Sequence, residues 1–426
     1  MGNLFGKECP ELQEAKSKPS CGVRWKPPAN GVFAAGERNG DFSRQNVDSG
    51  VGKINPRDFM LSDKHKQVYV REPGSIGGQQ FMVEECSDCD VYLLDNTAAL
   101  TIDVCTDCRI FTGPCESSIF VRNCKNCTLV LACQQFRARD CSGCTFFLFS
   151  ATKPVIESSS DLRFACYTLD YFSLAGQFSV ANLSVWDNKW SRIFNFTGGE
   201  GNWSCLPPGA HHRQGGHGIR TGIATKTILG GEAEKTSHPD YVANHLPEAA
   251  RQRAGYTDHT NGAVVPITAG VRDLKPEDET CFVAVMPSHI DVILGKLLAL
   301  GGGGAAPSSA TTCRLLRTKL FHPQKAQSKS FFEGASADMI ALASSAPVLG
   351  MQWAGSGGRE TAMSLLLAAG VITSVAEPTT TSNGTGCGIG GNGQFFMADG
   401  PEASATKAKV FFEQWGEDMG TSLLCG

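Results

Sequence analysis

The sequence predicts a mainly β domain, built as a parallel β-helix and followed by a smaller α/β domain. Three observations carry this prediction: a regular repeat of cysteine pairs, β-prone runs after each pair, and strand–helix alternation from residue 264 onward. The chain of 426 residues exceeds one ordinary core. Its 41% hydrophobic and 19% charged residues are typical of globular proteins. We therefore expect two or three domains.

The cysteine pairs recur at a nearly constant interval. Eleven of the 18 cysteines lie between Cys86 and Cys166, and eight of these form four CxxC pairs whose starts are 19, 19 and 17 residues apart. A parallel β-helix repeats in this way, because each coil stacks a small buried residue on its equivalents above and below. Reduced cysteine suits that inward position. The pairs are Cys86/Cys89, Cys105/Cys108, Cys124/Cys127 and Cys141/Cys144.

Two CxxC pairs at such a separation are also typical of a tetrahedral zinc site. A zinc site predicts closed groups of four ligands with irregular flanks. Here the period continues through four pairs, and no histidine occurs between Lys66 and Ala210. β-Prone runs follow the pairs at 91–94, 110–111, 129–131 and 146–149. We therefore favour the β-helix, and we expect neither a bound metal nor a cofactor.

Charge and hydropathy exclude other classes of protein. A formal net charge of -4 without a dense Lys/Arg block argues against nucleic acid as a partner. The longest apolar stretch, Met363 to Val375, is shorter than the ~20 residues that a membrane span needs. The first residues lack the apolar core of a signal peptide, so we expect a cytosolic chain with reduced thiols.

Four segments carry a resemblance to a known family: RNCKNC (122–127), ACQQFRARDC (132–141), PVIESSS (154–160) and NWSCLP (202–207). The chain resembles the family of the X-linked retinitis pigmentosa protein and tubulin-folding cofactor C, from about Val68 to Pro208 and more weakly from Val264 onward. The resemblance implies a right-handed parallel β-helix followed by a ferredoxin-like, nucleoside-diphosphate-kinase-like domain. It also implies GTPase-activating action on an Arf-like GTPase that controls delivery of lipidated cargo to cilia.

The chemistry of GTP hydrolysis suits an arginine supplied in trans. Negative charge develops on the phosphoryl oxygens, and a planar guanidinium that cannot deprotonate stabilises it. Strand alternation places Phe136 and Ala138 on one face and Arg137 and Arg139 on the other. A surface arginine is by itself usually a solvated charge. The resemblance implies that Arg137 is the arginine finger, that Gln134 assists it, and that Arg139 pairs with nearby carboxylates.

The resemblance further implies that Glu157 and Phe196 contact the GTPase. The chain would then be an activator of a GTP-bound Arf-like GTPase and not an enzyme on its own. Two alternatives remain: a non-catalytic effector or scaffold of the GTPase, and a tubulin-folding cofactor with tubulin-related partners. The second normally has a helical, tubulin-binding N-terminal region, which the short tail of this chain does not supply.

We expect four segments along the chain: a polar tail over 1–61, the β-helix over 62–208, a linker over 209–262 and the α/β domain over 263–426. The linker contains six of the nine histidines. They lack the fixed spacing or cysteine partners of a metal site, and we interpret them as solvated.

The N-terminus predicts a lipid anchor. Met1-Gly2 fits the start of an N-myristoylation motif, although Gly6 stands where the motif has Ser or Thr. A single myristoyl chain binds membranes only marginally, so stable anchoring needs a second signal such as acylation of Cys9. We expect a peripheral membrane protein at the cytoplasmic face of the plasma membrane and at the cilium base.

The α/β domain is predicted from strands at 281–286 and 347–353 and helices at 290–300 and 359–369. A nucleoside-diphosphate-kinase-like enzyme needs a phosphate-accepting histidine in its late loop, and only His289 and His322 occur here, both earlier. We therefore predict a non-catalytic interaction module. The GxGxxG match at 386–391 follows no predicted strand, and we interpret it as a loop.

Overall fold

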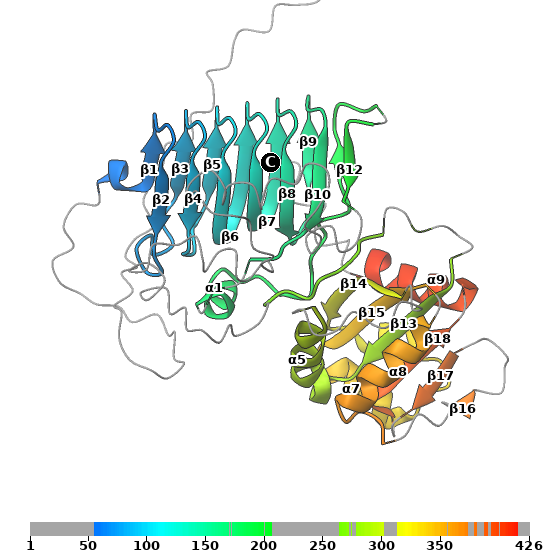
Figure 1. Ribbon diagram of the computed structural model, residues 1–426. Coiled ribbons are helices and arrows are strands. Elements are labelled where there is room, and N and C mark those ends of the chain that lie inside the picture. Colours follow the sequence, from blue (N-terminus) through cyan, green and yellow to red (C-terminus); the bar gives the residue numbers. More distant parts are fainter. Residues whose placement is uncertain are drawn as a thin grey trace, which may run out of the picture.

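The computed structural model describes residues 55–206 and 264–415, except for 170, 172, 200, 272–273, 275–277, 302–312, 356, 374–378, 381–386, 391–392 and 400. A parallel β-helix is followed by an α/β domain with one antiparallel sheet (Figure 1). The predicted fold class is confirmed. The tail with Gly2 and Cys9, and the linker over 209–262 with its histidines, lie outside the described residues.

The β-helix has two faces, and all of its strands pair in parallel. One face, termed the open face, contains β1 (Met60–Ser62), β3 (Phe81–Glu84), β5 (Leu100–Asp103), β9 (Val155–Glu157) and β11 (Phe194–Asn195). The other, termed the covered face, contains β2 (Val68–Arg71), β4 (Asp90–Leu93), β8 (Thr145–Ser150), β10 (Leu162–Cys166) and β12 (Trp203–Cys205). The long strands β6 (Arg109–Arg122) and β7 (Thr128–Arg139) run through both faces.

Burial separates the two faces. On the open face, buried and half-buried residues alternate along β3 and β5, as expected for strands with one solvated side. On the covered face, every residue of β4 and β8 is buried. Helix α1 (Leu174–Val180) explains this difference, because Phe178 packs edge-on against Phe149 and Tyr167 outside the sheet. The outer side of the open face therefore remains available to a partner.

The cysteine pairs form two stacked columns inside the β-helix, as the repeat predicts. All eight are buried free thiols, and their Sγ atoms donate to backbone carbonyls, as Cys124 does to Arg122 at 3.1 Å. The residue before each cysteine of a pair has a left-handed backbone with φ between 51° and 66°. The CxxC spacing thus reflects a corner with two left-handed residues. Within the described ranges, no cluster of three or more His, Cys, Asp or Glu side chains is arranged to hold a metal ion.

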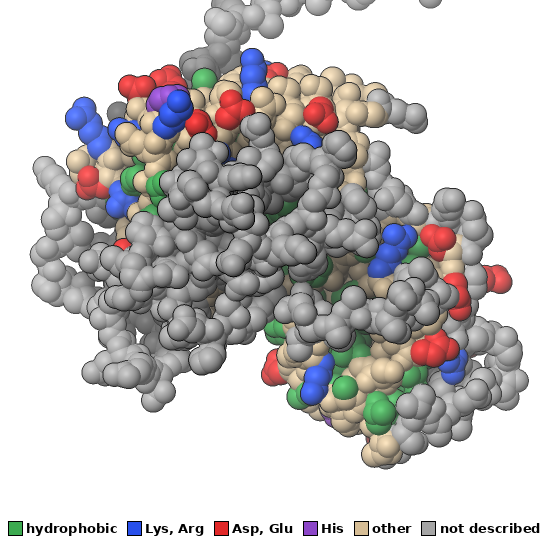
Figure 2. All heavy atoms as spheres, in the orientation of Figure 1, with side chains coloured by type: hydrophobic (Ala, Val, Ile, Leu, Met, Phe, Trp, Pro, Cys, Tyr) green, Lys and Arg blue, Asp and Glu red, His purple; other side chains and the backbone are tan. Residues whose placement is uncertain are grey.

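The β-helix begins a few residues before the predicted boundary at residue 61. A 3-10 helix, η1 (Pro56–Phe59), precedes β1, and Asn55 caps it by accepting a hydrogen bond from the backbone of Arg57. Leu61 of β1 is buried in the core of the β-helix. Figure 2 shows acidic and basic side chains interspersed along the upper edge of this domain, in line with the small net charge.

The α/β domain has a six-stranded antiparallel sheet with the order β14-β15-β13-β18-β17-β16. Strands β13, β14, β15 and β18 with helices α5 and α8 give the βαββαβ order of a ferredoxin-like fold. The strands are β13 (Thr280–Val285), β14 (Arg314–Phe321), β15 (Val348–Ala354), β16 (Thr379–Thr380), β17 (Cys387–Gly390) and β18 (Phe395–Asp399). The helices are η2 (Pro287–His289), α5 (Ile290–Gly301), α6 (Lys325–Phe331), α7 (Ala337–Ser345), α8 (Gly358–Ala368), α9 (Pro401–Lys409) and the π-helical η4 (Val410–Gln414).

Both faces of this sheet are covered. Residues of α5 and α8 pack on one face, and residues of α6, α7, α9 and η4 pack on the other. The two predicted strands and two predicted helices are confirmed to within two residues. The loop prediction for the GxGxxG segment is wrong for its middle part, because 387–390 form β17 and pair with β18. In the described part of the chain, no helix has the length and hydropathy to span a membrane.

Each domain contributes a buried side chain to the core of the other. Trp186, which follows α1, packs in the core of the α/β domain, and Val265 packs in the core between the covered face and α1. The Thr318 hydroxyl donates to the Trp186 carbonyl at 2.7 Å, and the Trp190 indole donates to the Thr268 hydroxyl at 3.0 Å. Residues 264–271 therefore belong to the junction between the domains.

Candidate functional site

The outer side of the open face carries Arg137. Its chain neighbours Phe136 and Ala138 are each 1% exposed and point into the core, which leaves Arg137 outside, as strand alternation predicts. The Phe136 ring packs edge-on against Phe146 and Phe164, with centroid separations of 5.1 and 6.3 Å. A slip of one residue would turn Phe136 into solvent and Arg137 into the core, so this packing fixes the arginine on the surface.

Apolar side chains of neighbouring coils lie level with Arg137. Phe120 of β6 and Val155 of β9 are its register partners on either side, and Phe194 of β11 pairs with Val155. Phe120 and Phe194 are 39% and 53% exposed, and Phe196 is 68% exposed. Phe194 and Phe196 meet edge-on at 6.4 Å. We term these five residues the arginine surface. Such a group of exposed aromatic side chains is typical of a protein-binding site.

The next row of the open face is charged. Arg122 pairs with Asp103 at 2.7 Å, and Arg139 pairs with the adjacent Asp140 at 3.0 Å. The prediction that Arg139 pairs with a carboxylate is confirmed. Glu157 is the register partner of Arg139 on β9. This row therefore contains basic and acidic side chains in nearly equal number.

Arg137 differs from its basic neighbours. Among the residues that the structure describes, no carboxylate forms an ion pair with its guanidinium. The side chain is exposed and stands between the aromatic rings of Phe120 and Phe194 along the row. Its donors can therefore reach oxygens of a bound partner without first breaking an internal ion pair.

Glu157 and Phe196 lie on adjacent strands, one row away from Arg137. The Phe196 backbone donates to the Ile156 carbonyl at 2.8 Å, so it extends the ladder just past the end of β11. Glu157 is half-buried at the end of β9. The structure thus brings Arg137, Glu157 and Phe196 to one surface from three successive coils.

Gln134 lies on the same strand as Arg137 but three residues earlier, where β7 passes from the covered face to the open face. Its side chain is half-buried, and its backbone carbonyl accepts hydrogen bonds from the backbone and the hydroxyl of Thr152, both at 3.0 Å. Gln134 is held firmly at the bend, and an assisting role for it stays a prediction.

Sequence reasoning missed Phe120, Val155 and Phe194 as members of this surface. The pattern Phe194-x-Phe196 was a usable signal, because two aromatic residues at alternate positions of a strand share a face. No such local signal marks Phe120 or Val155. Their proximity to Arg137 arises from the parallel register between coils.

The comparisons with known proteins agree with the motifs. Residues 78–196 match the family described as Tubulin binding cofactor C. Human Protein XRP2 is 33% identical over 312 residues, which cover 72% of this chain and 79% of that protein. Protein XRP2 of Mus musculus is 32% identical over 305 residues, covering 71% and 78%. Tubulin-folding cofactor C of Arabidopsis thaliana is 33% identical over 153 residues, covering 34% and 44%.

Two solved structures align with parts of the chain. Tubulin Binding Cofactor C from Leishmania major is 22% identical with a TM-score of 0.27 and covers 29% of this chain and 86% of its own. A nucleoside diphosphate kinase from Encephalitozoon cuniculi is 19% identical with a TM-score of 0.20 and covers 31% and 88%.

The β-helix and its motifs place the chain among proteins with a cofactor C-like domain. The similarity to Protein XRP2 extends over 312 residues and so beyond the cofactor C-like domain. It therefore defines a narrower family within that class. The chain belongs to the XRP2 family.

Proposed function

We propose that this protein is a GTPase-activating protein that supplies Arg137 to the active site of a GTP-bound Arf-like GTPase. The observation that carries the proposal is the position of Arg137 on a strand of the open face, exposed, between Phe120 and Val155, with Phe194 and Phe196 on the same face. A docking GTPase would cover those rings and exclude water. In a dry interface, one guanidinium stabilises developing phosphoryl charge far more than it would in solvent.

The wider role follows from the proposed lipid anchor. An acylated N-terminus would hold the protein at the cytoplasmic face of the plasma membrane and at the cilium base. There, by stimulating GTP hydrolysis, the protein would support the release or trafficking of lipidated cargo to the cilium. The α/β domain would act as a non-catalytic interaction module.

Single-turnover GTP hydrolysis tests the proposal with Arf-like GTPases of the source organism. Arg137→Ala should abolish acceleration, since an arginine finger contributes on the order of a thousandfold, about 4 kcal/mol of barrier. Arg137→Lys should fail nearly as badly, because lysine keeps the charge but loses the planar fork. Arg122→Ala is the matched control: it removes an exposed arginine of the same face, and stimulated hydrolysis should persist.

The result that contradicts catalysis is normal stimulated hydrolysis by Arg137→Ala with a GTPase that the wild type activates. Tight binding to the GTP-bound form without any acceleration, in the wild type itself, would indicate an effector or scaffold. A tubulin-folding role is the second candidate, favoured by the similarity to Tubulin-folding cofactor C. It predicts association with tubulin and not with an Arf-like GTPase.

A further inference from the structure

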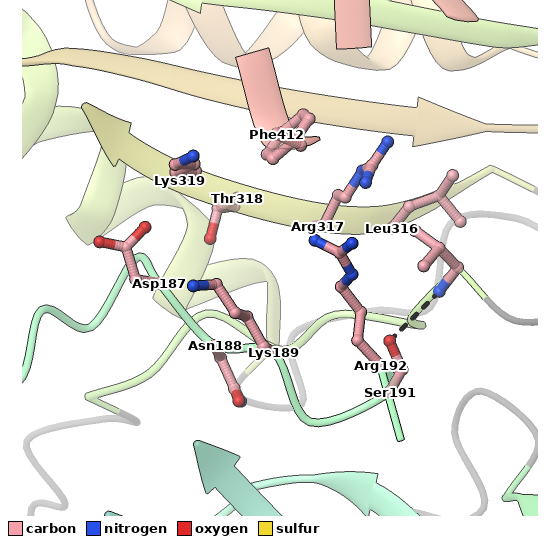
Figure 3. Close-up of a pocket in the computed structure, with 11 residues that line it drawn as sticks. Asp187, Asn188, Lys189, Ser191, Arg192, Leu316, Arg317, Thr318, Lys319 and Phe412 are labelled. Atoms are coloured by element: carbon pink, nitrogen blue, oxygen red, sulfur yellow. Dashed lines mark hydrogen bonds between the residues drawn. The ribbon is translucent and has the colours of Figure 1, made fainter. Parts of the chain in front are cut away.

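A small pocket, open to solvent, lies between the two domains. One wall is the segment 187–192, which connects α1 to β11, and the other is β14 with Phe412 of η4 (Figure 3). None of the residues of the arginine surface lines it. The pocket is therefore separate from the arginine surface.

Four basic side chains line this pocket, two from each domain. Lys189 and Arg192 come from the segment after α1, and Arg317 and Lys319 come from alternate positions of β14. Figure 3 shows the Arg192 guanidinium directed toward β14, near Arg317, whose own guanidinium extends toward Phe412. Asp187 is the one acidic residue in the lining. The pocket therefore concentrates positive charge within a chain whose net charge is -4.

Arg317 is held in place from several sides. It donates to the Gln352 side chain at 2.8 Å, pairs with Glu413 at 3.3 Å and lies over the Phe412 ring at 4.3 Å. Burial lowers the pKa of this guanidinium, Glu413 opposes that change, and the nearby Arg192 lowers the pKa further. Two guanidinium groups that repel each other in a partly buried pocket would be stabilised by an anion between them.

Two further donors, Lys319 and Ser191, belong to the lining of the pocket. The Lys319 ammonium donates to the Phe411 carbonyl at 3.2 Å and to the Trp415 carbonyl, so it is held against η4. Ser191 lines the pocket beside Arg192, and its hydroxyl accepts from the Val271 backbone at 3.4 Å, which leaves its own proton for an acceptor. Guanidinium and hydroxyl donors that line one pocket suit a tetrahedral oxyanion, which accepts several hydrogen bonds at once.

We propose that this pocket, termed the interdomain basic pocket, binds the phosphate group of a phosphorylated small molecule or lipid headgroup. The ligand would contact Lys189 and Arg192 of one domain and Arg317 of the other. A ligand with contacts on both sides binds only the docked arrangement, so binding would also stabilise the junction between the domains.

Calorimetric titration of the full chain with inorganic pyrophosphate at constant ionic strength tests the proposal. The wild type should bind at one site per chain, and Arg192→Gln and Lys189→Gln should each weaken binding about tenfold, as expected for loss of one charge-assisted contact. Lys125→Gln, which removes an exposed lysine of the β-helix, is the control and should leave the affinity unchanged.

Asp187→Asn provides a change in the opposite direction. Removing the one carboxylate of the lining should tighten pyrophosphate binding several-fold, a gain that misfolding cannot produce. A parallel arm uses vesicles with and without a phosphorylated phosphoinositide. Binding to those vesicles alone, lost in Arg192→Gln, would retain the phosphate site and assign it to a lipid. The proposal is overturned if neither probe binds, or if Lys125→Gln weakens binding as much as Arg192→Gln does.

Discussion

Arg137 shows how much of its setting depends on neighbours that are distant in sequence. Strand alternation alone predicts that it faces outward, and the buried Phe136 and Ala138 confirm this. The aromatic residues beside it come from other coils, 17 residues before it in the case of Phe120. An exposed ring costs free energy in the isolated protein, and that cost is relieved when a partner covers the ring.

The proposed contact residues should affect binding and not chemistry. Glu157→Ala and Phe196→Ala should raise the GTPase concentration needed for half-maximal stimulation about tenfold or more, while hydrolysis at saturation stays close to normal. Val68→Ala removes an exposed apolar side chain from the covered face and is the control. A loss of rate that saturating concentrations cannot restore would assign these residues to catalysis.

The sequence is therefore sufficient to predict that the Arg137 side chain faces outward. It is not sufficient to predict which side chains lie beside Arg137. The motif ACQQFRARDC and its alternation placed Arg137 outside. Phe194 reaches the same row only after the chain has left β10, formed α1 and returned as β11. Periodicity cannot follow an excursion of this kind, because the repeat of about 19 residues is interrupted there.

The corners of the coils are the element in which sequence and backbone agree best. Left-handed residues precede the paired cysteines, and most of them are Asp, Asn or Gly, which tolerate this backbone. The exceptions are Glu85 and Val104, and Val104 is the only β-branched one, with φ of 52° and a side chain that is 49% exposed. A β-branched residue in this conformation is strained. Because the Val104 side chain is largely exposed, hydrophobic burial does little to offset that strain.

Val104→Asn should consequently stabilise the β-helix. Asparagine stands at the equivalent corner of the next coil, at Asn123 with φ of 53°, so the backbone need not change. We expect an increase of about 1 kcal/mol in the free energy of unfolding, measured by urea denaturation. Val68→Asn, at an exposed strand position, should not stabilise the protein. Equal effects at both positions would show that removal of exposed apolar surface, and not relief of backbone strain, is responsible.

Elements without a repeat were harder to predict. Strand β14 has no clean alternation in sequence, and the structure shows a register shift between Leu315 and Arg317 that explains why. The glycine-rich sequence around β17 predicts a loop, yet pairing with β18 makes residues 387–390 a strand. In both cases tertiary pairing outweighs local propensity, which is weak for short or irregular strands.

At the scale of the whole molecule, the junction contains a carboxylate in an unfavourable setting. Burial raises the pKa of Asp187 to about 6, although Lys189 and Lys319 and the Leu320 backbone donor act in the opposite direction. The folded state therefore binds this proton more tightly than the unfolded state does. The ionised carboxylate disfavours folding fully above pH 6, and this effect disappears as the pH falls below the unfolded pKa near 4.

Asp187→Asn should then be more stable than the wild type at pH 7.5, and the advantage should shrink as the pH falls from 6 to 4. Urea denaturation at several pH values measures the difference. An advantage that is constant across this range would mean that the substitution acts through packing and not through the charge of Asp187.

The proposed lipid anchor also concerns the whole molecule. Gly2→Ala replaces the N-terminal glycine that N-myristoylation requires, so the protein should shift from the membrane fraction to the soluble fraction. Cys9→Ser should produce a weaker shift if acylation of that cysteine is the second signal. An unchanged distribution of Gly2→Ala between the two fractions would contradict the anchor.

The return of residues 264–271 to the β-helix has a consequence for the integrity of the chain. Val265 is buried in one domain and Trp186 in the other, and the Cβ of any larger residue at Gly270 would lie 2.6 Å from that of Ser191. A protease that cuts once between 207 and 263 would therefore leave two fragments interlocked through buried surface. Such fragments should copurify and separate only in denaturant. The length of the covalent connection can therefore vary without causing the two domains to dissociate.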